Sequence, residues 1–265
     1  MTHALPVPPN FDPQRAVQMA REALAIEAAA LTELSPRLSD SFARTVQAML
    51  ACNGRVVVMG MGKSGHVGRK IAATLASTGT PAMFVHPAEA SHGDLGMVTT
   101  KDVVLALSNS GESDELNAVL PVLKRQGVVI VAMTGRAESS LASHADLVLD
   151  SFVAQEACPL NLAPTASTTA QMALGDALAV ALLDARGFKP EDFARSHPGG
   201  ALGRKLLTHV RDLMRSGDAL PLVSAGTSFT EMMREMSAKS MGVAIVVDAQ
   251  QQVQGIFTDG DLRRL

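Results

Sequence analysis

The sequence predicts an α/β domain built on a doubly wound, five-stranded parallel sheet. Two observations carry this prediction. Short apolar runs alternate with longer stretches of helical spacing between residues 55 and 186, and each run is apolar throughout rather than at every second residue. Strands of this kind are buried on both faces, which is typical of parallel sheets covered by crossover helices. Right-handed crossovers then place helices on both faces of the sheet.

Two helices are expected before the first strand, at residues 13–33 and 36–52, where apolar positions recur at helical spacing among many alanines. The five strands are expected at residues 55–59, 81–85, 102–107, 128–133 and 147–149, the last of them weak. Helices that follow these strands are expected at residues 64–77, 114–125, 139–144 and 165–186.

The pattern changes after residue 203. A run at 210–214 (VRDLM) opens a β-α-β-β-α unit, and a Met-rich helix at 228–239 follows it. The rest of the unit is expected as strands at 243–247 and 253–257 and the start of a helix at 259–264. Such a unit is too small to bury a core of its own, so it should need a partner. We therefore expect two domains, residues 1–207 and 208–265.

Composition excludes several functions. The 265 residues carry a formal net charge of −3 and contain no Trp and no Tyr, which argues against binding of nucleic acid. Without Trp, a sugar must be held by hydrogen bonds and charge. Two cysteines far apart in the sequence fit a reducing compartment. Residues 1–12 have no apolar leader, and Asp176 interrupts the most apolar helix, which we expect to be too short for a membrane span. The cytoplasm is the expected location, with no membrane partner.

The loop after the first strand, residues 60–65, formally matches G-x-G-x-x-G. A dinucleotide site would need an acidic residue at the end of the second strand, where His86 stands, and a P-loop would need glycine in place of Val57. A tight turn alone would also explain the glycines. Lys63 and Ser64, at the start of a helix, are suitable donors for an anion.

Two further loops are rich in hydroxyl groups at the start of a helix. Residues 108–113 (SNSGES) follow the third strand, where free backbone N–H groups and the helix dipole favour phosphate. Capping is the alternative, but one capping residue would suffice, so three serines favour phosphate. Residues 164–169 (PTASTT) open the long helix, and either capping or a second contact with phosphate or sugar explains them.

Together these loops resemble those of sugar-isomerase (SIS) domains, whose fold is flavodoxin-like. The resemblance is closer to the arabinose 5-phosphate isomerase family and extends over residues 11–265. It rests on MGMGKSGH (59–66), STGTP (77–81), HGDLGM (92–97), SNSGES (108–113), EACP and LAPT (156–165), and FARSHPGGALGR (193–204). GIFTDGDLRR (255–264) is similar to the first CBS module that follows the SIS domain in this family, and here that module is partial.

The resemblance implies an aldose–ketose isomerase that interconverts D-arabinose 5-phosphate and D-ribulose 5-phosphate for 3-deoxy-D-manno-octulosonate and lipopolysaccharide synthesis. It also implies a homotetramer with shared active sites. The reaction passes through an enediolate, so it needs a base, an acid and a partner for the oxyanion, with no required cofactor. The family's four catalytic positions fall on Lys63, Glu115, Glu156 and His197.

Each of these four side chains suits a role. We expect Glu156 to be the base, with burial raising its pKa. His197 would open the ring and act as acid from a rigid turn made by Pro198 and the glycines, entering the site of a neighbouring subunit. Lys63 would pair with the enediolate or a phosphate. Glu115 lies in the first turn of a helix, where dipole effects alone favour an acid, and it either takes part directly or orients Lys63 or His197.

The expected substrate-binding residues are Gly62, Ser64, His86, His92, Ser108, Asn109, Ser110, Ser113, Thr165, Ser167 and Thr168. His86, His92 and Asp94 could hold an adventitious or inhibitory zinc ion, His86 being the first candidate ligand, or they contact substrate or backbone instead. Two other functions stay open: a non-catalytic phosphosugar sensor and a nucleotide-dependent dehydrogenase. The sequence does not separate a lipopolysaccharide enzyme from one for capsule or sugar-alcohol metabolism.

Overall fold

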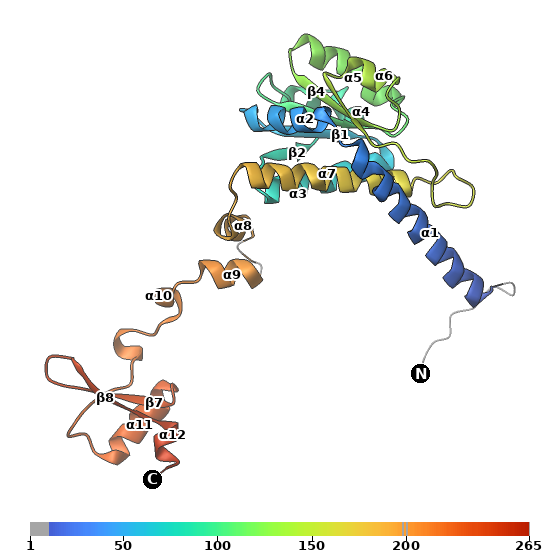
Figure 1. The fold of residues 1–265 in the computed structure, drawn as a ribbon. Coiled ribbons are helices and arrows are strands. Elements are labelled where there is room, and N and C mark those ends of the chain that lie inside the picture. The colour runs from blue at the N-terminus through green and yellow to red at the C-terminus, as the bar shows by residue number, and fades with distance from the viewer. Residues whose placement is uncertain (1–10, 198, 200, 265) are drawn as a thin grey trace. The chain divides into compact units, whose positions relative to one another are not determined.

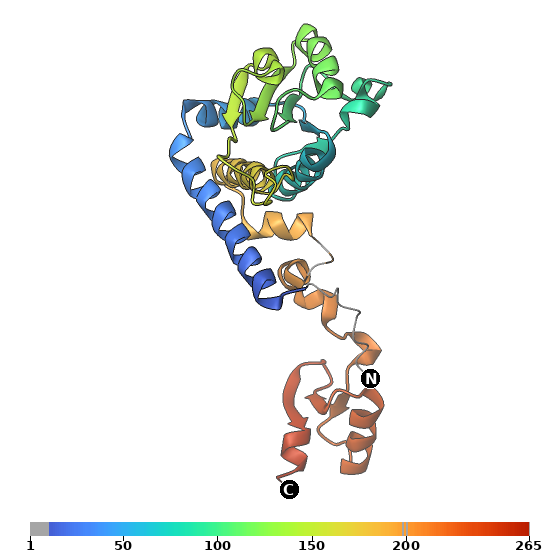
Figure 2. The same ribbon diagram turned by 90° about the vertical axis from the view of Figure 1, so that its right-hand side faces the viewer.

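The computed structural model describes residues 11–197, 199 and 201–264. They form two compact units, which meet in sequence between Leu206 and Leu207. The N-terminal unit contains a five-stranded parallel sheet (Figures 1 and 2). Its strands are β1 (Val56–Gly60), β2 (Ala82–Phe84), β3 (Val103–Leu107), β4 (Val129–Thr134) and β5 (Leu147–Asp150). The predicted α/β class and parallel sheet are confirmed.

The strand order is β2-β1-β3-β4-β5. From β1 the chain moves outward to β2 on one side and then returns to β3 on the other. In a sheet of this order the connections leave β1 and β3 in opposite directions, which opens a crevice between the carboxyl ends of these two strands. The crevice is the place where ligands bind in open α/β sheets, so the loops after β1 and β3 hold the candidate site.

Helices cover both faces of this sheet. One face packs against α2 (Asp40–Ala51), α3 (Gly62–Ser77) and α7 (Ala166–Ala185), and the other against α4 (Pro87–Ala90), α5 (Asp114–Arg125) and α6 (Ser140–His144). Figure 1 shows α5 and α6 above the sheet, with α3 and α7 below it. Side chains of β1 alternate between the two layers: Val56 and Val58 join the first, Val57 and Met59 the second. The doubly wound arrangement follows from this alternation within fully buried strands.

The N-terminal segment differs in detail from the prediction. The first helix, α1, spans Pro13–Leu34, but a short 3-10 turn at Ser35–Arg37 separates it from α2. The second helix therefore begins at Asp40, four residues later than expected. Leu38 is extended after the turn, with φ −61° and ψ 120°, and this breaks the helical run.

Helices α3 and α7 lie side by side and pack closely. A Cβ atom on Gly175 of α7 would collide with the Cδ1 atom of Ile71 on α3, so only glycine allows this approach. Lys70 and Asp176 form an ion pair on the same seam. Both helices begin after the carboxyl end of a strand, so their positive N-termini lie at the edge of the sheet that carries the loops.

Helix α7 corrects one expectation about length. Among the residues that the structure describes, it is long and apolar enough to cross a membrane by length and composition, so the stretch is not too short. Half of its apolar window is buried inside the protein, however, and residues such as Leu174, Leu178 and Leu182 belong to the core. Its apolar composition is thus explained by burial against the sheet.

At the amino edge of the sheet, Asp102 ties the segments before β1 and β3 together. Its carboxylate accepts hydrogen bonds from the backbone N–H groups of Arg55 and Thr99, each at 2.7 Å, and from the Thr99 hydroxyl at 2.9 Å. A Cβ atom on Gly54 would collide with Asp102 Oδ1, so the neighbouring glycine leaves room for the carboxylate. Burial raises the pKa of Asp102, but the hydrogen bonds from Thr99 and Arg55 outweigh it and hold the pKa below its ordinary value.

We expect Asp102→Asn to lower the free energy of unfolding by about 2 kcal/mol at pH 7, since charged hydrogen bonds are lost. A depressed pKa contributes stability that is present above the unfolded pKa and is lost as the pH falls through the folded pKa. The wild type should therefore lose stability below about pH 4 more steeply than the variant. Urea unfolding at pH 7, 5, 4 and 3 measures both effects. Parallel pH curves for the two proteins would contradict the assignment.

The chain from Lys189 onward corrects the prediction in one place. Helices α8 (Pro190–Ser196) and α9 (Ala201–Leu207) come first, and residues 210–214 are not a strand, since α10 spans Val210–Leu213. The strand that opens the small unit is β6 (Leu222–Ser224), which pairs in parallel with β7 (Val243–Val247). The run VRDLM stays helical because Asp212 at the third helical position accepts from the backbone N–H of His209.

The remainder of the small unit follows the prediction. It contains α11 (Phe229–Lys239), β8 (Val253–Thr258) and α12 (Asp259–Leu262), with β8 antiparallel to β7. Among its described residues, Val223, Met236 and Ala244 form a buried apolar cluster, and partly buried side chains such as Met232 and Phe257 pack against it. The Met-rich helix thus supplies core side chains, which suits the flexible methionine side chain.

Candidate functional site

The loop after β1 is a tight turn that leads directly into α3. A Cβ atom on Gly65 would lie 2.7 Å from the carbonyl oxygen of Gly60, and Gly62 has a φ of +51°. The turn therefore requires its glycines for steric reasons. Met61 provides no side-chain cap for α3, and no side chain among the described residues is bonded to the N–H groups of its first turn. Lys63 is exposed beside them. This arrangement suits an anion.

The Ser-rich loop after β3 is held by its own hydroxyl groups. Ser108 Oγ accepts a hydrogen bond from the N–H of Gly111 at 3.0 Å, and Ser110 Oγ accepts one from the N–H of Glu112 at 3.2 Å. Ser113 precedes α5 but does not cap it; its hydroxyl donates to Glu115 at 3.0 Å instead. Helix capping therefore does not explain Ser113, although Ser113 is the N-cap residue of α5. Serine hydroxyls that accept these bonds can still donate their protons to an anion.

Glu156 lies in the loop between β5 and α7 and serves as the cap of that helix. Its Oε2 atom accepts hydrogen bonds from the N–H of Thr165 at 2.7 Å, from the Thr165 hydroxyl at 3.0 Å and from the N–H of Ser167 at 3.1 Å. The Thr168 hydroxyl donates to the carbonyl of Thr165. Capping in residues 164–169 is therefore performed by a carboxylate from another part of the loop, rather than by the hydroxyl groups themselves.

The expectation that burial raises the pKa of Glu156 is wrong in its net direction. Burial does raise the pKa, but hydrogen bonds from Ser167 and Thr165 outweigh it and hold the pKa below its ordinary value. Glu156 is thus a carboxylate at neutral pH, and all three of its described bonds fall on one oxygen. The other oxygen, Oε1, has no described partner and is the atom able to take a proton.

Two of the predicted residues line one hollow of about 380 Å³ at the carboxyl edge of the sheet. Asn109 comes from the end of β3, and Glu156 from the loop after β5. Between them lie Gly135 and the exposed Arg136, which follow β4. A Cβ atom on Gly135 would lie 2.6 Å from Asn109 Oδ1, a buried oxygen with no partner among the described residues. The hollow is predominantly polar, which suits a ligand with many hydroxyl groups.

His197 ends α8, and its ring is held by Phe193. The two rings are stacked with centroids 4.1 Å apart, and His197 Nδ1 lies 3.1 Å from the Phe193 carbonyl oxygen. A carbonyl only accepts, so Nδ1 carries the proton and Nε2 stays available for acid or base chemistry. The structure does not bring His197 to Glu156 within one chain by any described contact. The expected turn at Pro198 and Gly200 lies outside the described residues.

The histidines after β2 do not assemble as a metal site. Among the described residues, no group of three or more His, Cys, Asp or Glu side chains is arranged to hold a metal ion, so His86, His92 and Asp94 do not form one. His92 is exposed. His86 precedes α4, and its Nδ1 atom is buried without a described partner. This leaves contact with a ligand open for His86.

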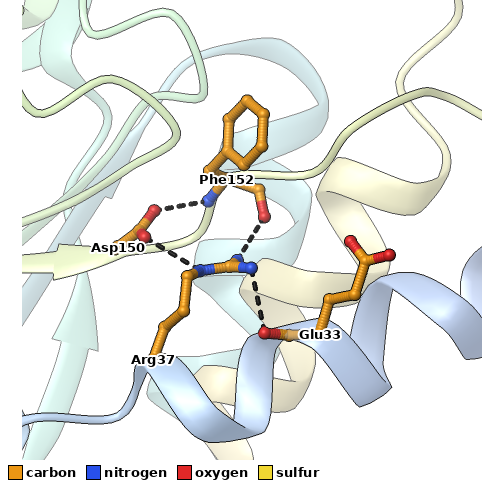
Figure 3. Close-up of polar contacts among 4 residues, drawn as sticks. All are labelled: Glu33, Arg37, Asp150 and Phe152. Carbon is orange, nitrogen blue, oxygen red and sulfur yellow. Dashed lines mark hydrogen bonds and ion pairs between the residues drawn. The ribbon is translucent and has the colours of Figure 1, made fainter.

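Arg37 is a residue that supports the site's loop and that the sequence analysis missed (Figure 3). Its guanidinium donates to Asp150 Oδ2 at 2.9 Å, to the Phe152 carbonyl at 2.5 Å and to the Glu33 carbonyl at 2.9 Å. Asp150 also accepts from the N–H of Phe152 at 2.8 Å. These bonds fix the end of β5, where the Glu156 loop begins. No local signal marks Arg37, since its partners Asp150 and Phe152 stand more than 100 residues later in the chain.

We expect Arg37→Met to lower the free energy of unfolding by about 1–2 kcal/mol, because a partly exposed ion pair and two hydrogen bonds are lost. Because the loop that carries Glu156 is then held less firmly, kcat for the reaction proposed below should fall, with a smaller change in KM. Steady-state kinetics and urea unfolding measure these effects. Arg15→Met is the matched control, since Arg15 forms an exposed ion pair with Glu22 at 3.8 Å on α1, and it should leave both quantities unchanged.

Comparison with known proteins gives the family. The SIS domain model matches residues 49–181, and the CBS domain model matches residues 210–265. The arabinose 5-phosphate isomerase KdsD of Pseudomonas aeruginosa is 58% identical over 248 residues, which cover 94% of this chain and 76% of that protein. KdsD of Escherichia coli K12 is 58% identical over 257 residues, covering 97% of this chain and 77% of that protein.

Solved structures agree. The protein c3406 of E. coli CFT073, solved in complex with arabinose 5-phosphate, matches with a TM-score of 0.69 and 42% identity, covering 71% of this chain and all of that one. A putative sugar-phosphate isomerase from Listeria monocytogenes matches with a TM-score of 0.70 and 31% identity, covering 72% and 100%. By these similarities, and by a parallel sheet with its loops at the switch between β1 and β3, the chain belongs to the arabinose 5-phosphate isomerase family, with a SIS domain followed by a CBS domain.

Proposed function

We propose that this chain is an aldose–ketose isomerase that interconverts D-arabinose 5-phosphate and D-ribulose 5-phosphate. The observation that carries the proposal is the carboxyl edge of the sheet, where α3 and α5 begin after the neighbouring strands β1 and β3, neither has a side-chain cap from its N-cap residue, and a hydroxyl-rich loop precedes α5. Two positive helix ends at one edge favour a phosphate dianion. Identity of 58% to KdsD enzymes supports the choice of pentose substrate.

The residues then take these roles. Glu156, ionised and with Oε1 open, removes the proton from C2 of the aldose and returns it to C1 of the enediolate. His197 Nε2 exchanges protons with the ring oxygen and the substrate hydroxyls. Lys63, exposed at the start of α3, neutralises the enediolate or the phosphate. Glu115, which accepts from the Ser113 hydroxyl at the start of α5, takes part directly or orients Lys63 or His197.

The proposal also covers the cofactor requirement, location, oligomeric state and pathway of the enzyme. The reaction involves no net oxidation, so it requires no redox cofactor; it also requires no metal, because Lys63 and the helix ends supply the positive charge, and any zinc bound by His86 would be adventitious or inhibitory. We place the enzyme in the cytoplasm, as a homotetramer with active sites shared between subunits. It would supply 3-deoxy-D-manno-octulosonate and hence lipopolysaccharide synthesis.

The test is an assay of purified protein on a panel of pentose and hexose phosphates, with product identified by chromatography. We expect turnover of arabinose 5-phosphate and ribulose 5-phosphate without added cofactor, and no loss of rate in EDTA. Binding of these sugars without turnover would instead support the non-catalytic sensor. Turnover of another phosphosugar alone would overturn the substrate assignment.

A further inference from the structure

Gln171 is a buried residue of α7 that has no part in the chemistry described above. Its side chain is 0% exposed and lies against α3. Its Oε1 atom is 3.2 Å from Ser64 Oγ, which donates to it, while its Nε2 atom has no partner among the described residues. If the carboxamide turns over, its nitrogen faces Ser64 and its oxygen is left unpaired. Either way, one bond goes to Ser64 and one polar atom is unsatisfied.

Fold stability does not explain a glutamine at this position. A buried amide without a partner is unfavourable for folding, and an apolar side chain of similar length would avoid that cost. The packing next to Gln171 on the core side is apolar and close, with Ile71 packed against Gly175 one turn further along α7 and with Leu174 in the core. A polar residue kept in such a place despite its cost points to a functional reason.

Ser64 supplies that reason. It is the third residue of α3, next to Lys63, in the turn that follows β1 at the carboxyl edge of the sheet. The first-turn N–H groups of α3 have no side-chain cap and are free to receive an anion. The bond to Gln171 joins two helices that are 107 residues apart in sequence. It thus fixes both the rotamer of Ser64 and the position of this turn above α7.

We propose that Gln171 is a positioning residue, which holds Ser64 and the first turn of α3 in the orientation that receives the phosphate group of the substrate. It does not touch the substrate, since it is fully buried, and it acts through Ser64. The inference rests on the proposed function only in taking the ligand to be a phosphosugar.

The first test is Gln171→Met, which keeps the side-chain length and removes both polar atoms. We expect its Tm to equal or exceed that of the wild type, while calorimetry shows inorganic phosphate binding about tenfold more weakly. KM for arabinose 5-phosphate should rise by a similar factor, with a smaller change in kcat. Asp176→Asn is the matched control: it removes the ion pair with Lys70 on the same seam and should leave phosphate binding unchanged.

A double-mutant cycle then tests whether Gln171 acts through Ser64. In a Ser64→Ala background, Gln171→Met should weaken phosphate binding by less than about twofold, because the bond it would break is already absent. Three results would each overturn the proposal. The first is a double variant whose loss of phosphate affinity equals the product of the two single losses. The others are a Gln171→Met variant with wild-type phosphate affinity and a clear drop in the Tm of that variant.

Phosphate binding also separates this inference from the proposed function. Calorimetry with inorganic phosphate needs no turnover. A wild type that binds phosphate but isomerises no pentose phosphate would refute the isomerase and leave the role of Gln171 intact. An active isomerase whose Gln171→Met variant binds phosphate normally would support the proposed function and refute the role of Gln171.

Discussion

Glu156→Gln is expected to lower kcat by about 1,000-fold while leaving the fold intact, because a carboxamide cannot take the substrate proton. The glutamine oxygen can still accept from the N–H groups of Thr165 and Ser167, so the start of α7 keeps its cap. The decisive measurement is exchange of the C2 proton with heavy water. Wild-type protein should wash deuterium into recovered arabinose 5-phosphate, and the variant should not.

A matched control is available for Glu156. Glu231 also binds a helix start through its carboxylate, accepting from the Ser228 hydroxyl at 2.8 Å at the start of α11 in the small unit, and has no role in the proposed chemistry. Glu231→Gln should keep kcat within about threefold of wild type. If Glu156→Gln retained more than about a tenth of wild-type kcat, or if both variants lost activity equally, Glu156 would not be the base.

His197→Ala is expected to lower kcat for arabinose 5-phosphate by about 100-fold, since general acid catalysis by an imidazole is lost. The loss should be much smaller for the 4-deoxy analogue of this substrate, because the missing hydroxyl prevents ring closure and no ring has to be opened. His144→Ala is the control, because His144 Nδ1 makes the same kind of bond, 2.8 Å to the carbonyl of Ser140, away from the site. Equal losses for the two substrates would contradict a role in ring opening.

The same two variants test whether sites are shared between subunits. If His197 enters the site of a neighbour, inactive Glu156→Gln and His197→Ala proteins should form mixed oligomers in which about a quarter of the sites are complete. Refolding the two together should recover activity that neither has alone. Failure to recover activity, with both variants shown to exchange subunits, would place His197 in the site of its own chain.

The sequence predicted the sheet well because most of its strands are short, uniformly apolar runs that alternate with helical stretches, a pattern typical of a buried parallel sheet. Val56–Gly60 and Val103–Leu107 are fully buried, as their uniform apolarity required. The run VRDLM was misassigned because five residues of mixed polarity fit either a strand or a single helical turn. There the hydrogen bond from His209 to Asp212 decides the outcome, and no periodicity shows it.

The site was predictable as a set of loops but not as a set of bonds. The positions after β1 and β3 follow from the strand order, and the Ser-rich loop follows from its composition. The pKa of Glu156 was predicted in the wrong direction because burial was considered without the N–H groups of Thr165 and Ser167, which only the folded loop brings to it. Arg37 and Gln171 were missed for the same reason, since both act on residues more than 100 positions away.

The hydrogen bonds of Arg37 imply that activity is lost before the fold when the protein is perturbed. The Arg37 guanidinium, which follows α1 in the chain, binds Asp150 and Phe152 at the end of β5 (Figure 3). The loop that carries Glu156 begins at this point. Arg37 itself belongs to neither apolar layer of the sheet, although Leu34 at the end of α1 belongs to one of them. Loss of the Arg37 bonds alone, with α1 and its core residue Leu34 left in place, should therefore reduce turnover at temperatures where the central sheet is still folded, and an inhibitor that displaces this guanidinium would not have to occupy the sugar site.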